Sequence, residues 1–489
     1  MQPEEVLIKE REKKLELLKK AGINPYPYSF KTTAEAKYLQ EKYSKLKNEE
    51  KTKDTFKVAG RIIIIRDIGK IIFIDLQDSS RKIQIVLQEN ETPKDKIDFI
   101  KKFIDIGDYI GITGTIFRTK RGEISILVKD LQLLSKSIKP LPEKWHGLKD
   151  KEERYRKRYL DLIINPEVKD VFLKREKILD LIREFLKSKS FIEVDTPYLQ
   201  SVYGGAEARP FTTHLNALNI KLYLSISPEL YLKRLIIGGM DKVFTIARNF
   251  RNEGIDKWHN PEFTMMEIYQ AYSDYNDMME LFEEICEFTC KKIHGTTKIE
   301  YQGQLIDFKK PWKRITMAEA IKKYAKIDVL KMTDKELLKF VKSNQIKYKN
   351  ESWGLLVQSI FENYCEKELI QPTFIIDHPK ETTPLCKVHR KDSRLIERFE
   401  PFCMGTELGN AYSELNDPFI QKELFKEQEK RLKQGDEEAH PNDLEFLEAL
   451  NYGMPPTGGI GLGIDRFVML LTNSSSIKDV IFFPFMKPE

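Results

Sequence analysis

The spacing of apolar and polar residues divides the chain into a helical start, a β-rich middle and a longer mixed region. Residues 1–55 are rich in Lys and Glu, and the segment EEVLIKEREKKLELLKK carries its apolar residues in a loose helical stripe. Gly22 and Pro25 follow this segment as stop signals. The pattern predicts a helical N-terminal extension over residues 1–55, whose lysines either form a solvated face or contact phosphate groups.

Five strand-like runs and one helix make up the β-rich region. The runs are FKVAGRIIIIR, KIIFIDLQD, RKIQIVLQ, DYIGITGTIFRT and GEISILVKDLQLL, with the helical PKDKIDFIKKF between the third and the fourth. Three strands, a helix and two strands is the order of a five-stranded OB barrel, a fold that often holds single-stranded nucleic acid. We therefore expect an OB-fold domain over residues 56–138, and the strands alone leave open whether it binds nucleic acid.

A segment with two prolines and a basic helix, residues 139–163, predicts a linker to a second domain over residues 164–489. That domain opens with a long amphipathic helix, VFLKREKILDLIREFLKSKSF, which leads into a strand, IEVDTPYL. Further along, MAEAIKKYAK, DKELLKFVKS and LLVQSIFENYCEKELI predict a small helical insertion within residues 291–372, followed by a strand at TFIID.

Composition narrows the class of protein. The formal net charge of +6, from 82 basic and 76 acidic residues, excludes a polybasic nucleic-acid binder but allows a local basic face. The five cysteines are odd in number and irregularly spaced, which predicts buried thiols rather than a metal site. No run approaches 18 apolar residues and the N-terminus has no apolar signal segment, so we expect a soluble, cytoplasmic protein without a membrane segment.

The segment RNFRNEGIDKWHNPEFTMME places much fixed charge between two strand-like runs. Side chains two apart on a strand share a face, so Phe263, Met265, Glu267 and Tyr269 are predicted to point one way. A core strand seldom carries a Glu there, because a buried unpaired carboxylate destabilises the fold. Arg251 offers a fork for a phosphate or a carboxylate. The alternative is a solvated hairpin tip without a function.

A second cluster lies in RLIERFEPFCMGTELGNAYSELND. By the same rule Asn410, Tyr412 and Glu414 share one strand face, and Glu400 and Glu407 lie just upstream. Acids that converge on a sheet repel one another, bind Mg²⁺ through oxygen ligands or hold a cationic substrate. The apolar neighbours of these residues fit poorly with a solvated acidic hairpin.

A third feature is the glycine-rich segment MPPTGGIGLGIDRF. We interpret its glycines as a close backbone turn before a helix that begins near Ile464, with Arg466 in the first turn. A helix start and a guanidinium both favour an anion. The glycine spacing matches neither the dinucleotide-binding nor the Walker pattern.

Together these segments resemble the three motifs of class II aminoacyl-tRNA synthetases: the long helix with IEVDTP, then RNFRNEG with HNPEFT, then GIGLGIDRF. SVYGGAEARPFTTH, PELYLKRLIIGGMDKVF, NPEFTMMEIYQAYSDY and ELGNAYSELNDP resemble the lysyl-tRNA synthetases of that class more closely. The resemblance covers the whole chain. It implies an α+β fold, with an N-terminal anticodon-binding OB barrel followed by a six-stranded antiparallel catalytic sheet flanked by helices. It also implies a homodimer built through the first motif.

The function implied by the resemblance is that of a lysine–tRNA ligase, which uses ATP, L-lysine and tRNA(Lys) with Mg²⁺ as cofactor. The implied ATP contacts are Arg251, Glu253, His259, Asn260, Phe263, Gly463 and Arg466, with Mg²⁺ on Glu400 and Glu407. The implied lysine pocket is formed by Gly205, Glu229, Arg251, Glu267, Tyr269, Asn410, Tyr412 and Glu414. Arg251 and Arg466 would be the catalytic pair, and Glu414 and Tyr269 would meet the ε-ammonium group.

The resemblance also implies an anticodon site in the barrel, at Arg66, Phe73, Gln84 and Glu123. Phe73 would stack on a base and the polar groups would bond base edges, as in single-stranded RNA recognition. Phe73 as ordinary barrel core is the alternative. The nearest rival function is an aspartyl or asparaginyl relative, but a pocket for an anionic side chain would need a Lys or Arg where Glu267 and Glu414 stand.

Overall fold

The computed structural model of the chain describes residues 3–142, 148 and 150–488, which divide between Leu148 and Lys149 into two units. The predicted linker, residues 139–163, spans this division, and its residues 143–147 and 149 lie outside the described residues, as do residues 1–2 and 489. From α4 (Lys151–Arg156) and α5 (Arg158–Ile164) onward the chain belongs to the second unit.

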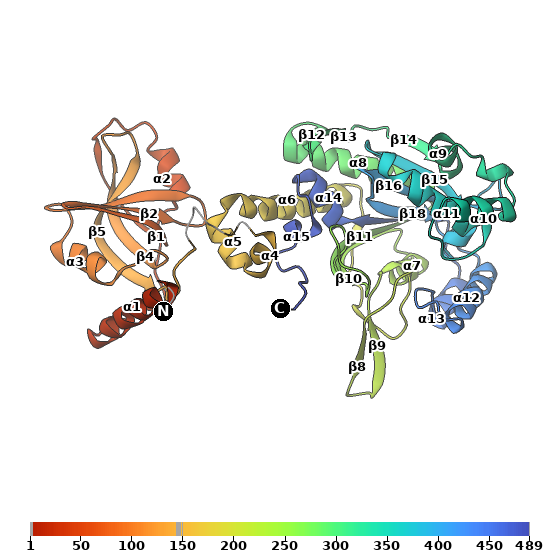
Figure 1. Cartoon of the computed structure of the whole chain (residues 1–489), viewed down its shortest axis with the longest axis horizontal. Coiled ribbons are helices and arrows are strands. Elements are labelled where there is room, and N and C mark those ends of the chain that lie inside the picture. The colour runs from red at the N-terminus through yellow and green to blue at the C-terminus, as the bar shows by residue number, and fades with distance from the viewer. Residues whose placement is uncertain (1–2, 143–147, 149, 489) are drawn as a thin grey trace. The chain divides into compact units, whose positions relative to one another are not determined.

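The first unit is a closed five-stranded barrel of the predicted OB type (Figure 1). Its strands pair in the order β1, β2, β3, β5, β4, with β3 parallel to β5 and the other pairs antiparallel. The elements are α1 (Pro3–Lys20), α2 (Ala36–Lys42), β1 (Lys51–Ile68), β2 (Ile71–Gln77), β3 (Lys82–Gln88), α3 (Lys94–Phe103), β4 (Tyr109–Arg118) and β5 (Ile124–Ser135). The first strand thus begins five residues before the start expected from the sequence.

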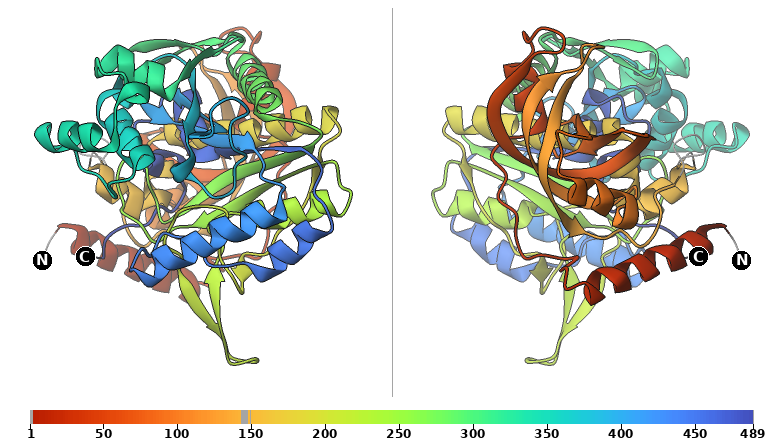
Figure 2. Two further views of the ribbon diagram at one scale, coloured as in Figure 1. Left: turned by 90° about the vertical axis from the view of Figure 1, so that its right-hand side faces the viewer. Right: turned by 90° about the vertical axis from the view of Figure 1, so that its left-hand side faces the viewer.

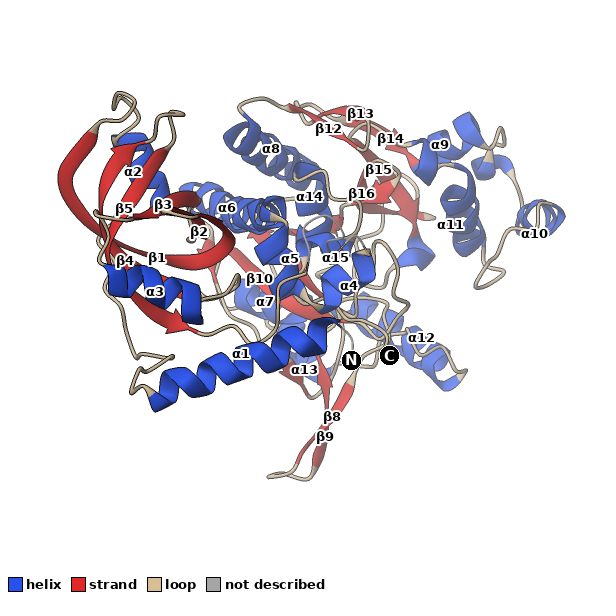
Figure 3. Ribbon diagram, turned by 60° about the vertical axis from the view of Figure 1, so that its left-hand side comes forward, coloured by secondary structure: helices blue, strands red, loops and turns tan. Residues whose placement is uncertain are grey.

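Alternation along the strands sets the inside of the barrel. On β2, Ile72, Ile74 and Leu76 are buried in the barrel core, whereas Phe73 and Asp75 between them face outward. The two N-terminal helices join this core through side chains such as Leu18 and Leu39. Figure 3 shows α2 and α3 outside the curved strands. The N-terminal extension is therefore packed on the barrel rather than free of it.

One buried lysine joins the end of β5 to the connection between α3 and β4. The Nζ atom of Lys136 donates to the Phe103 carbonyl at 2.8 Å, and it lies 2.5 Å from Asp105 and 2.7 Å from Asp108. The side chains of Lys136 and Asp108 are fully buried. Since a buried ion pair is stable only while both partners are present, this cluster fixes the last strand of the barrel.

The second unit is built on a mixed nine-stranded sheet. Its order is β14, β15, β16, β18, β19, β11, β10, β6, with β17 paired to β16. The strands are β6 (Ile192–Glu193), β10 (Lys242–Phe250), β11 (Glu262–Ala271), β14 (Lys313–Thr316), β15 (Thr373–Pro379), β16 (Leu395–Cys403), β17 (Thr406–Glu407), β18 (Gly409–Ser413) and β19 (Thr457–Gly463). From β15 to β10 six strands run antiparallel, and a parallel strand, β14 or β6, closes each edge. The six-stranded antiparallel sheet that the resemblance implied is thus present, extended at both edges.

The two faces of this sheet are covered differently. On one face, α6 (Pro166–Ser188), α8 (Tyr275–His294) and α14 (Ile464–Leu471) bury a core that includes Met266 and Ile268 of β11 (Figures 1 and 3). On the other face, α7 (Glu229–Ile237) packs with α12 (Pro418–Lys433) and α13 (Leu444–Asn451). That second face carries Glu267 and Tyr269, and the space between it and α7 holds the site described below.

The region between α8 and β15 is only partly helical, in contrast to the helical insertion predicted over residues 291–372. It begins with a hairpin and an edge strand, and its helices follow from Met317 onward. The elements are β12 (Lys298–Tyr301), β13 (Gln304–Asp307), β14, α9 (Met317–Tyr324), η1 (Val329–Lys331), α10 (Asp334–Ser343), α11 (Trp353–Tyr364) and η2 (Glu366–Glu368). The sequence pattern found these helices but missed the short strands before them.

The remaining elements are a small three-stranded sheet and two short helical segments. The sheet, β7 (Leu199–Gln200), β9 (Ile220–Leu224) and β8 (Thr212–Leu215), ends in a hairpin that projects from its unit in both views of Figure 2. The helical segments are η3 (Lys380–Thr382) and α15 (Ile477–Val480). All five cysteines are buried free thiols, as predicted. In the described part of the chain no helix is long and apolar enough to cross a membrane.

We expect Lys136→Met to destabilise the barrel by about 3–5 kcal/mol, because it leaves the buried carboxylate of Asp108 without its cation. Hydrogen exchange of the β4 and β5 amides in the full chain measures this loss. Lys129→Met is the matched control, since Lys129 pairs with Glu91 on the surface and its loss should change stability by less than about 1 kcal/mol. Equal effects of the two substitutions would contradict the role of Lys136.

Candidate active site

Strand register brings the predicted site residues into two rows across β11, β19 and β18. Glu267 lies opposite Gly461, which lies opposite Asn410. In the next row Tyr269 lies opposite Gly459, which lies opposite Tyr412. Because residues directly opposite on paired strands share a face, the side chains of β11 and those of β18 flank a strip along β19 that has no side chains. The parity predicted for both strands is therefore confirmed.

A cavity of about 300 Å³, here called the acidic cavity, lies over this strip. Its lining includes all eight residues predicted for the amino-acid pocket: Gly205, Glu229, Arg251, Glu267, Tyr269, Asn410, Tyr412 and Glu414. Three of these carboxylates are almost completely buried, at 3% exposure for Glu229, 4% for Glu267 and 1% for Glu414. Buried carboxylates are unfavourable unless they are paired, so the ionised forms of these acids need cations close by.

Hydroxyl groups hold two of the three carboxylates in place. Glu267 accepts hydrogen bonds from Ser227 Oγ at 3.0 Å and from Tyr269 Oη at 2.9 Å. Glu229 accepts from Tyr412 Oη at 2.8 and 2.7 Å, one distance to each oxygen. The tyrosines therefore orient the two acids.

Lys233 is a member of this cluster that the sequence analysis missed. It lies one helical turn after Glu229 on α7, is fully buried, and donates to Glu229 Oε1 at 2.6 Å. Its Nζ atom also contacts Glu414 Oε2. The i,i+4 spacing from Glu229 in a predicted helix was the available signal. Within the described chain Glu414 Oε1 has no hydrogen-bond partner.

Burial and mutual repulsion shift the titration of these acids. Burial and the charge of Glu229 raise the pKa of Glu267 from 4.5 to about 8. Burial also raises the pKa of Glu414 well above its usual value, an effect that Lys233 opposes. A carboxyl with a raised pKa is protonated in the empty site over more of the pH range, and a bound cation returns it to the ionised form.

The glycine-rich segment forms β19, a central strand, and the turn predicted there is wrong. The helix start at Ile464 is confirmed by α14. A Cβ atom on Gly459 would collide with Glu414 Oε1 and would lie 2.6 Å from Tyr269 Cε1. A Cβ atom on Gly461 would lie 2.6 Å from Met265 Cε. These glycines are present because any side chain would fill the acidic cavity, whereas the sequence interpretation assigned them to backbone turning.

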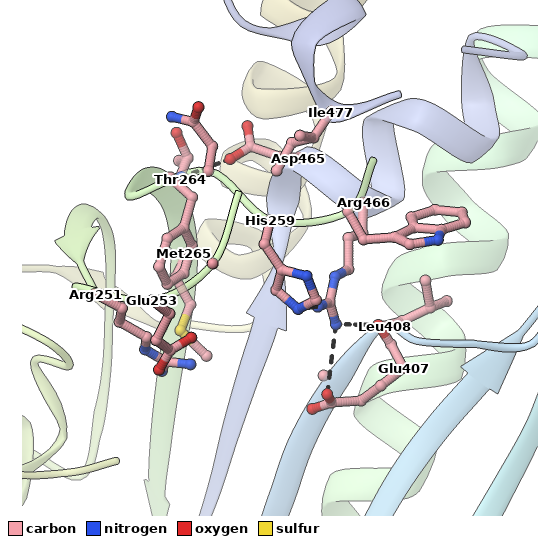
Figure 4. A pocket seen from close by; sticks show the side chains of 16 residues that line it. Arg251, Glu253, His259, Thr264, Met265, Glu407, Leu408, Asp465, Arg466 and Ile477 are labelled. Carbon is pink, nitrogen blue, oxygen red and sulfur yellow. Dashed lines mark hydrogen bonds and ion pairs between the residues drawn. The ribbon is translucent and has the colours of Figure 1, made fainter. Parts of the chain in front are cut away.

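Figure 4 shows a second cavity, here called the arginine cavity. It adjoins the acidic cavity, with which it shares lining residues. Arg251, Met265 and Glu407 line both. The lining of the second cavity also includes the predicted ATP contacts Glu253, His259, Asn260, Phe263, Gly463 and Arg466. Arg251 follows the end of β10, and its guanidinium carbon lies 5.1 Å from the centre of the Phe263 ring. A flat aromatic ring beside a fixed cation suits a base joined to an anionic group.

Arg466 lies in the first turn of α14 and reaches across the arginine cavity, as Figure 4 shows. Its Nη1 atom donates to the Glu407 carbonyl at 2.7 Å and lies 3.4 Å from Glu407 Oε2. Its Nη2 atom is 3.1 Å from His259 Nε2, and Asp256 holds the other side of that ring at 2.9 Å. The guanidinium is thus aimed at the cavity from a helix start, where an anion is favoured.

A buried network fixes the start of α14, and the sequence analysis did not single it out. Asp465 accepts from the Thr264 amide at 2.7 Å and pairs with Arg175 of α6 at 2.5 Å. Arg175 also donates to Thr264 Oγ1 at 2.9 Å. Three segments far apart in sequence, one from each motif, are therefore joined directly behind Arg466.

Glu400 and Glu407, the predicted metal ligands, lie on β16 and β17. Arg398, a residue the analysis missed two positions before Glu400, donates to Glu400 at 2.6 Å and to Asn410 Oδ1 at 2.8 Å. Burial raises the pKa of Glu407, and the nearby charge of Glu400 raises it further. Two mutually repelling carboxylates suit a hard divalent cation. Among the described residues no cluster of three or more protein ligands forms.

Asn260 uses its side chain within the protein. Its amide nitrogen donates to the Glu262 carbonyl at 2.6 Å, and its oxygen accepts from the Phe485 amide at 3.1 Å. The residue lines the arginine cavity and anchors the C-terminal segment to it. His259, by contrast, has its Nε2 atom directed toward Arg466 in the cavity.

In the first unit, the four residues predicted for the anticodon site share the outer face of the barrel. Arg66 lies opposite Phe73 on paired strands, and Gln84 donates to Glu123 at 3.0 Å. Phe73 is half-buried and lies outside the barrel core, so the core alternative for this residue is wrong. Asp75, which pairs with Arg66 at 3.0 Å, is an addition to this face.

Comparisons with known proteins give the same picture over nearly the whole chain. Residues 150–487 match the family described as tRNA synthetases class II (D, K and N), and residues 56–134 match the OB-fold nucleic acid binding domain. The chain is 51% identical to a lysine–tRNA ligase of Clostridium novyi, over 99% of this chain and 94% of that one. It is 49% identical to a lysine–tRNA ligase of Thermotoga maritima, over 98% and 96%. The chain belongs to the class II tRNA synthetases, in the lysine–tRNA ligase family.

Proposed function

We propose that this chain activates L-lysine with ATP and transfers it to tRNA(Lys), with the acidic cavity as the lysine pocket. The observation that carries the proposal is the match of charges inside one cavity. Three buried carboxylates and Arg251 line it, and lysine presents two ammonium groups and one carboxylate. A pocket for aspartate would need cations where Glu267 and Glu414 lie.

Lysine binds with its carboxylate toward Arg251, which lines both cavities. In this orientation Glu229 and Glu267 receive the α-ammonium group, near the backbone of Gly205. The ε-ammonium group meets Glu414, whose Oε1 atom accepts no hydrogen bond from the described chain, and Tyr269. Asn410 and Tyr412 complete the walls. In this orientation the length of the lysine side chain must match the distance between Glu414 and the two acids that receive the α-ammonium group.

ATP occupies the arginine cavity in this proposal. Its adenine stacks on Phe263, Arg251 contacts the α-phosphate and Arg466 the γ-phosphate. Glu253, His259, Asn260 and the backbone at Gly463 line the remaining space. Because Arg251 meets both the amino acid and the nucleotide, it fixes the two reacting groups relative to one another.

The first step is an in-line displacement at the α-phosphorus. A carboxylate oxygen of lysine forms the new bond to phosphorus, the bond to the bridging oxygen breaks, and pyrophosphate leaves with the electron pair. No proton moves in this step, so positioning and charge stabilisation by Arg251 and Arg466 carry the catalysis. Glu400 and Glu407 would hold Mg²⁺, which supplies further neutralisation of phosphate charge when bound.

In the second step a hydroxyl at the 3′ end of tRNA attacks the lysyl carbonyl carbon and AMP leaves. The outer face of the barrel binds the anticodon through Arg66, Phe73, Gln84 and Glu123. A stacking ring among polar groups is the usual arrangement for reading single-stranded RNA. The barrel supplies recognition of the tRNA, and the second unit supplies the chemistry.

A homodimer formed near α6 and a cytoplasmic location belong to the same proposal. The apolar side chains of Leu173, Phe483 and Phe485 are 54%, 77% and 54% exposed. Exposed apolar side chains favour contact with another protein when they gather in one patch. A second copy of the chain at the first motif would cover them.

The proposal predicts lysine-dependent ATP–pyrophosphate exchange by the purified chain with Mg²⁺. Aspartate and asparagine should support no exchange. Gly459→Ala should raise the KM for lysine by about 100-fold, because the added methyl group displaces Glu414 and Tyr269. The KM for ATP should change by less than about threefold, since Gly459 does not line the arginine cavity.

Gly238→Ala is the matched control for Gly459→Ala. Gly238 caps α7 outside both cavities, and a Cβ atom there would come no nearer than 3.3 Å to its neighbours. It should leave both KM values unchanged. Exchange with aspartate or asparagine in place of lysine would disprove the substrate assignment.

The raised pKa of Glu267 predicts a pH-dependent KM for lysine. A carboxyl with a pKa of about 8 in the empty site is protonated at lower pH, and only its ionised form pairs with an ammonium group. The KM for lysine should therefore fall up to about tenfold per pH unit between pH 6 and 8. Glu267→Gln should bind lysine more weakly and show a shallower slope, since only the titration of Glu414 remains. A KM that is flat over this range in the unmodified chain would contradict the prediction.

Phe73→Ala should weaken tRNA binding by about 5- to 150-fold, because base–aromatic stacking contributes about 1–3 kcal/mol per base. The measurement is the KM for tRNA(Lys) in aminoacylation, with lysine-dependent exchange as the internal reference that stays unchanged. Tyr109→Ala is the control, since Tyr109 is an exposed aromatic residue of the same barrel, stacked on Arg61. An equal loss in both variants would argue against an anticodon role for Phe73.

A further inference from the structure

Lys233 is a buried cation that pairs with two of the acids lining the acidic cavity. Its side chain is fully buried, it donates to Glu229 at 2.6 Å, and it contacts Glu414. Glu229 and Glu414 come from different elements, one at the start of α7 and the other just after β18. The lysine therefore bridges the two acids that the proposed function assigns to the two ammonium groups of the substrate.

The other titratable groups that face Lys233 add no charge. Burial raises the pKa of the Cys386 thiol and of the Tyr412 phenol well above their usual values, so both are neutral. Burial lowers the pKa of His440 to about 4, so its imidazole is neutral as well. Tyr412 and Phe446 surround the ammonium group with their rings, 5.6 and 5.9 Å from the ring centres.

Around the positions assigned to the two ammonium groups of the substrate, the charge is thus set by three carboxyl groups and one ammonium group, while the other charged lining residues lie toward the arginine cavity or the rim and are left out of this sum. With Glu229, Glu267 and Glu414 ionised, Lys233 brings the sum to −2. The substrate brings two ammonium groups, and its carboxylate pairs with Arg251 outside this sum. The occupied pocket is therefore neutral. Without Lys233 a third negative charge would remain buried beside the substrate, which is strongly unfavourable.

We propose that Lys233 is a specificity-determining residue, the internal counter-cation that matches the charge of the pocket to a substrate with two ammonium groups. It also holds Glu414 by one oxygen, so that the other, Oε1, faces the cavity without a hydrogen bond from the described residues. This inference rests on the proposed function, because it takes lysine as the ligand of the acidic cavity.

The test is Lys233→Met, with lysine binding and proton release measured together. Without the buried cation one carboxyl takes up a proton in the empty site, and lysine must displace it. Calorimetry at pH 7 in buffers of different ionisation enthalpy should show about one more proton released per lysine bound than in the unmodified chain. The KM for lysine in exchange should rise by about tenfold or more and fall as the pH is raised.

Lys136→Met is the matched control, because Lys136 is also a fully buried lysine between two carboxylates, in the other unit. It should lower stability without changing the proton count or the KM for lysine. If Lys233→Met does not fold, proton release and the KM for lysine are measured on Lys233→Gln, which retains a hydrogen-bonding group. It should release the same extra proton.

The outcomes separate the inference from the function on which it rests. If the unmodified chain shows no lysine-dependent exchange, the proposed function fails. If that exchange is present but the variants of Lys233 keep the KM for lysine and the proton count of the unmodified chain, Lys233 only packs the helix and the inference is wrong. A KM that rises without any change in proton release also overturns it, because a merely structural defect would do the same.

Discussion

The second unit depends on accommodating three buried carboxyl groups inside a folded sheet, two of which, Glu267 and Glu414, have raised pKa values. Glu229, Glu267 and Glu414 have almost no contact with water, and burial alone would protonate them or unfold the region around them. Hydroxyl groups of Tyr412, Tyr269 and Ser227 and the ammonium group of Lys233 donate hydrogen bonds to these acids and stabilise their ionised forms. A deficit of positive charge remains around the three acids, and a ligand with two cationic groups would remove it.

The open space over these acids comes from one central strand. β19 lies between β11 and β18, and its residues Gly459 and Gly461 lie between the site side chains of β11 and those of β18. A strand interior without side chains loses packing and conformational restraint, which destabilises a sheet locally. The sheet tolerates this because the other residues of the strand, Ile460 and Leu462, point into the main core. The same strand then runs directly into α14, so the strip that opens the acidic cavity also positions Arg466 at the neighbouring cavity.

Much of this arrangement follows from local sequence rules. These rules do not reveal contacts between segments that are distant in sequence. Parity on a strand predicted that Glu267 and Tyr269 share a face, and likewise Tyr412 and Glu414, because side-chain alternation needs no knowledge of the fold. The order of strands and helix predicted the barrel for the same reason. Sequence could not show that Gly459 belongs to a strand, since glycine is compatible with a turn and only the neighbouring strands reveal the space it leaves. Lys233 was missed because its contact with Glu414 joins residues that are distant in sequence. Arg398 was missed because Asn410, to which it donates, lies on another strand.

Side chains alternate along β11 between the apolar core on one face of the sheet and the two cavities on the other. Met266 and Ile268 lie in the core under α6, α8 and α14, whereas Met265, Glu267 and Tyr269 line the cavities. Thr264 is the exception, because its backbone and hydroxyl join Asp465 and Arg175 behind Arg466. Through this network, which borders the arginine cavity at Thr264 and Asp465, a displacement of α6 would shift the start of α14. Helix α6 is therefore joined through Asp465 to the start of α14, so the position of Arg466 in the lining of the arginine cavity depends on how α6 is held.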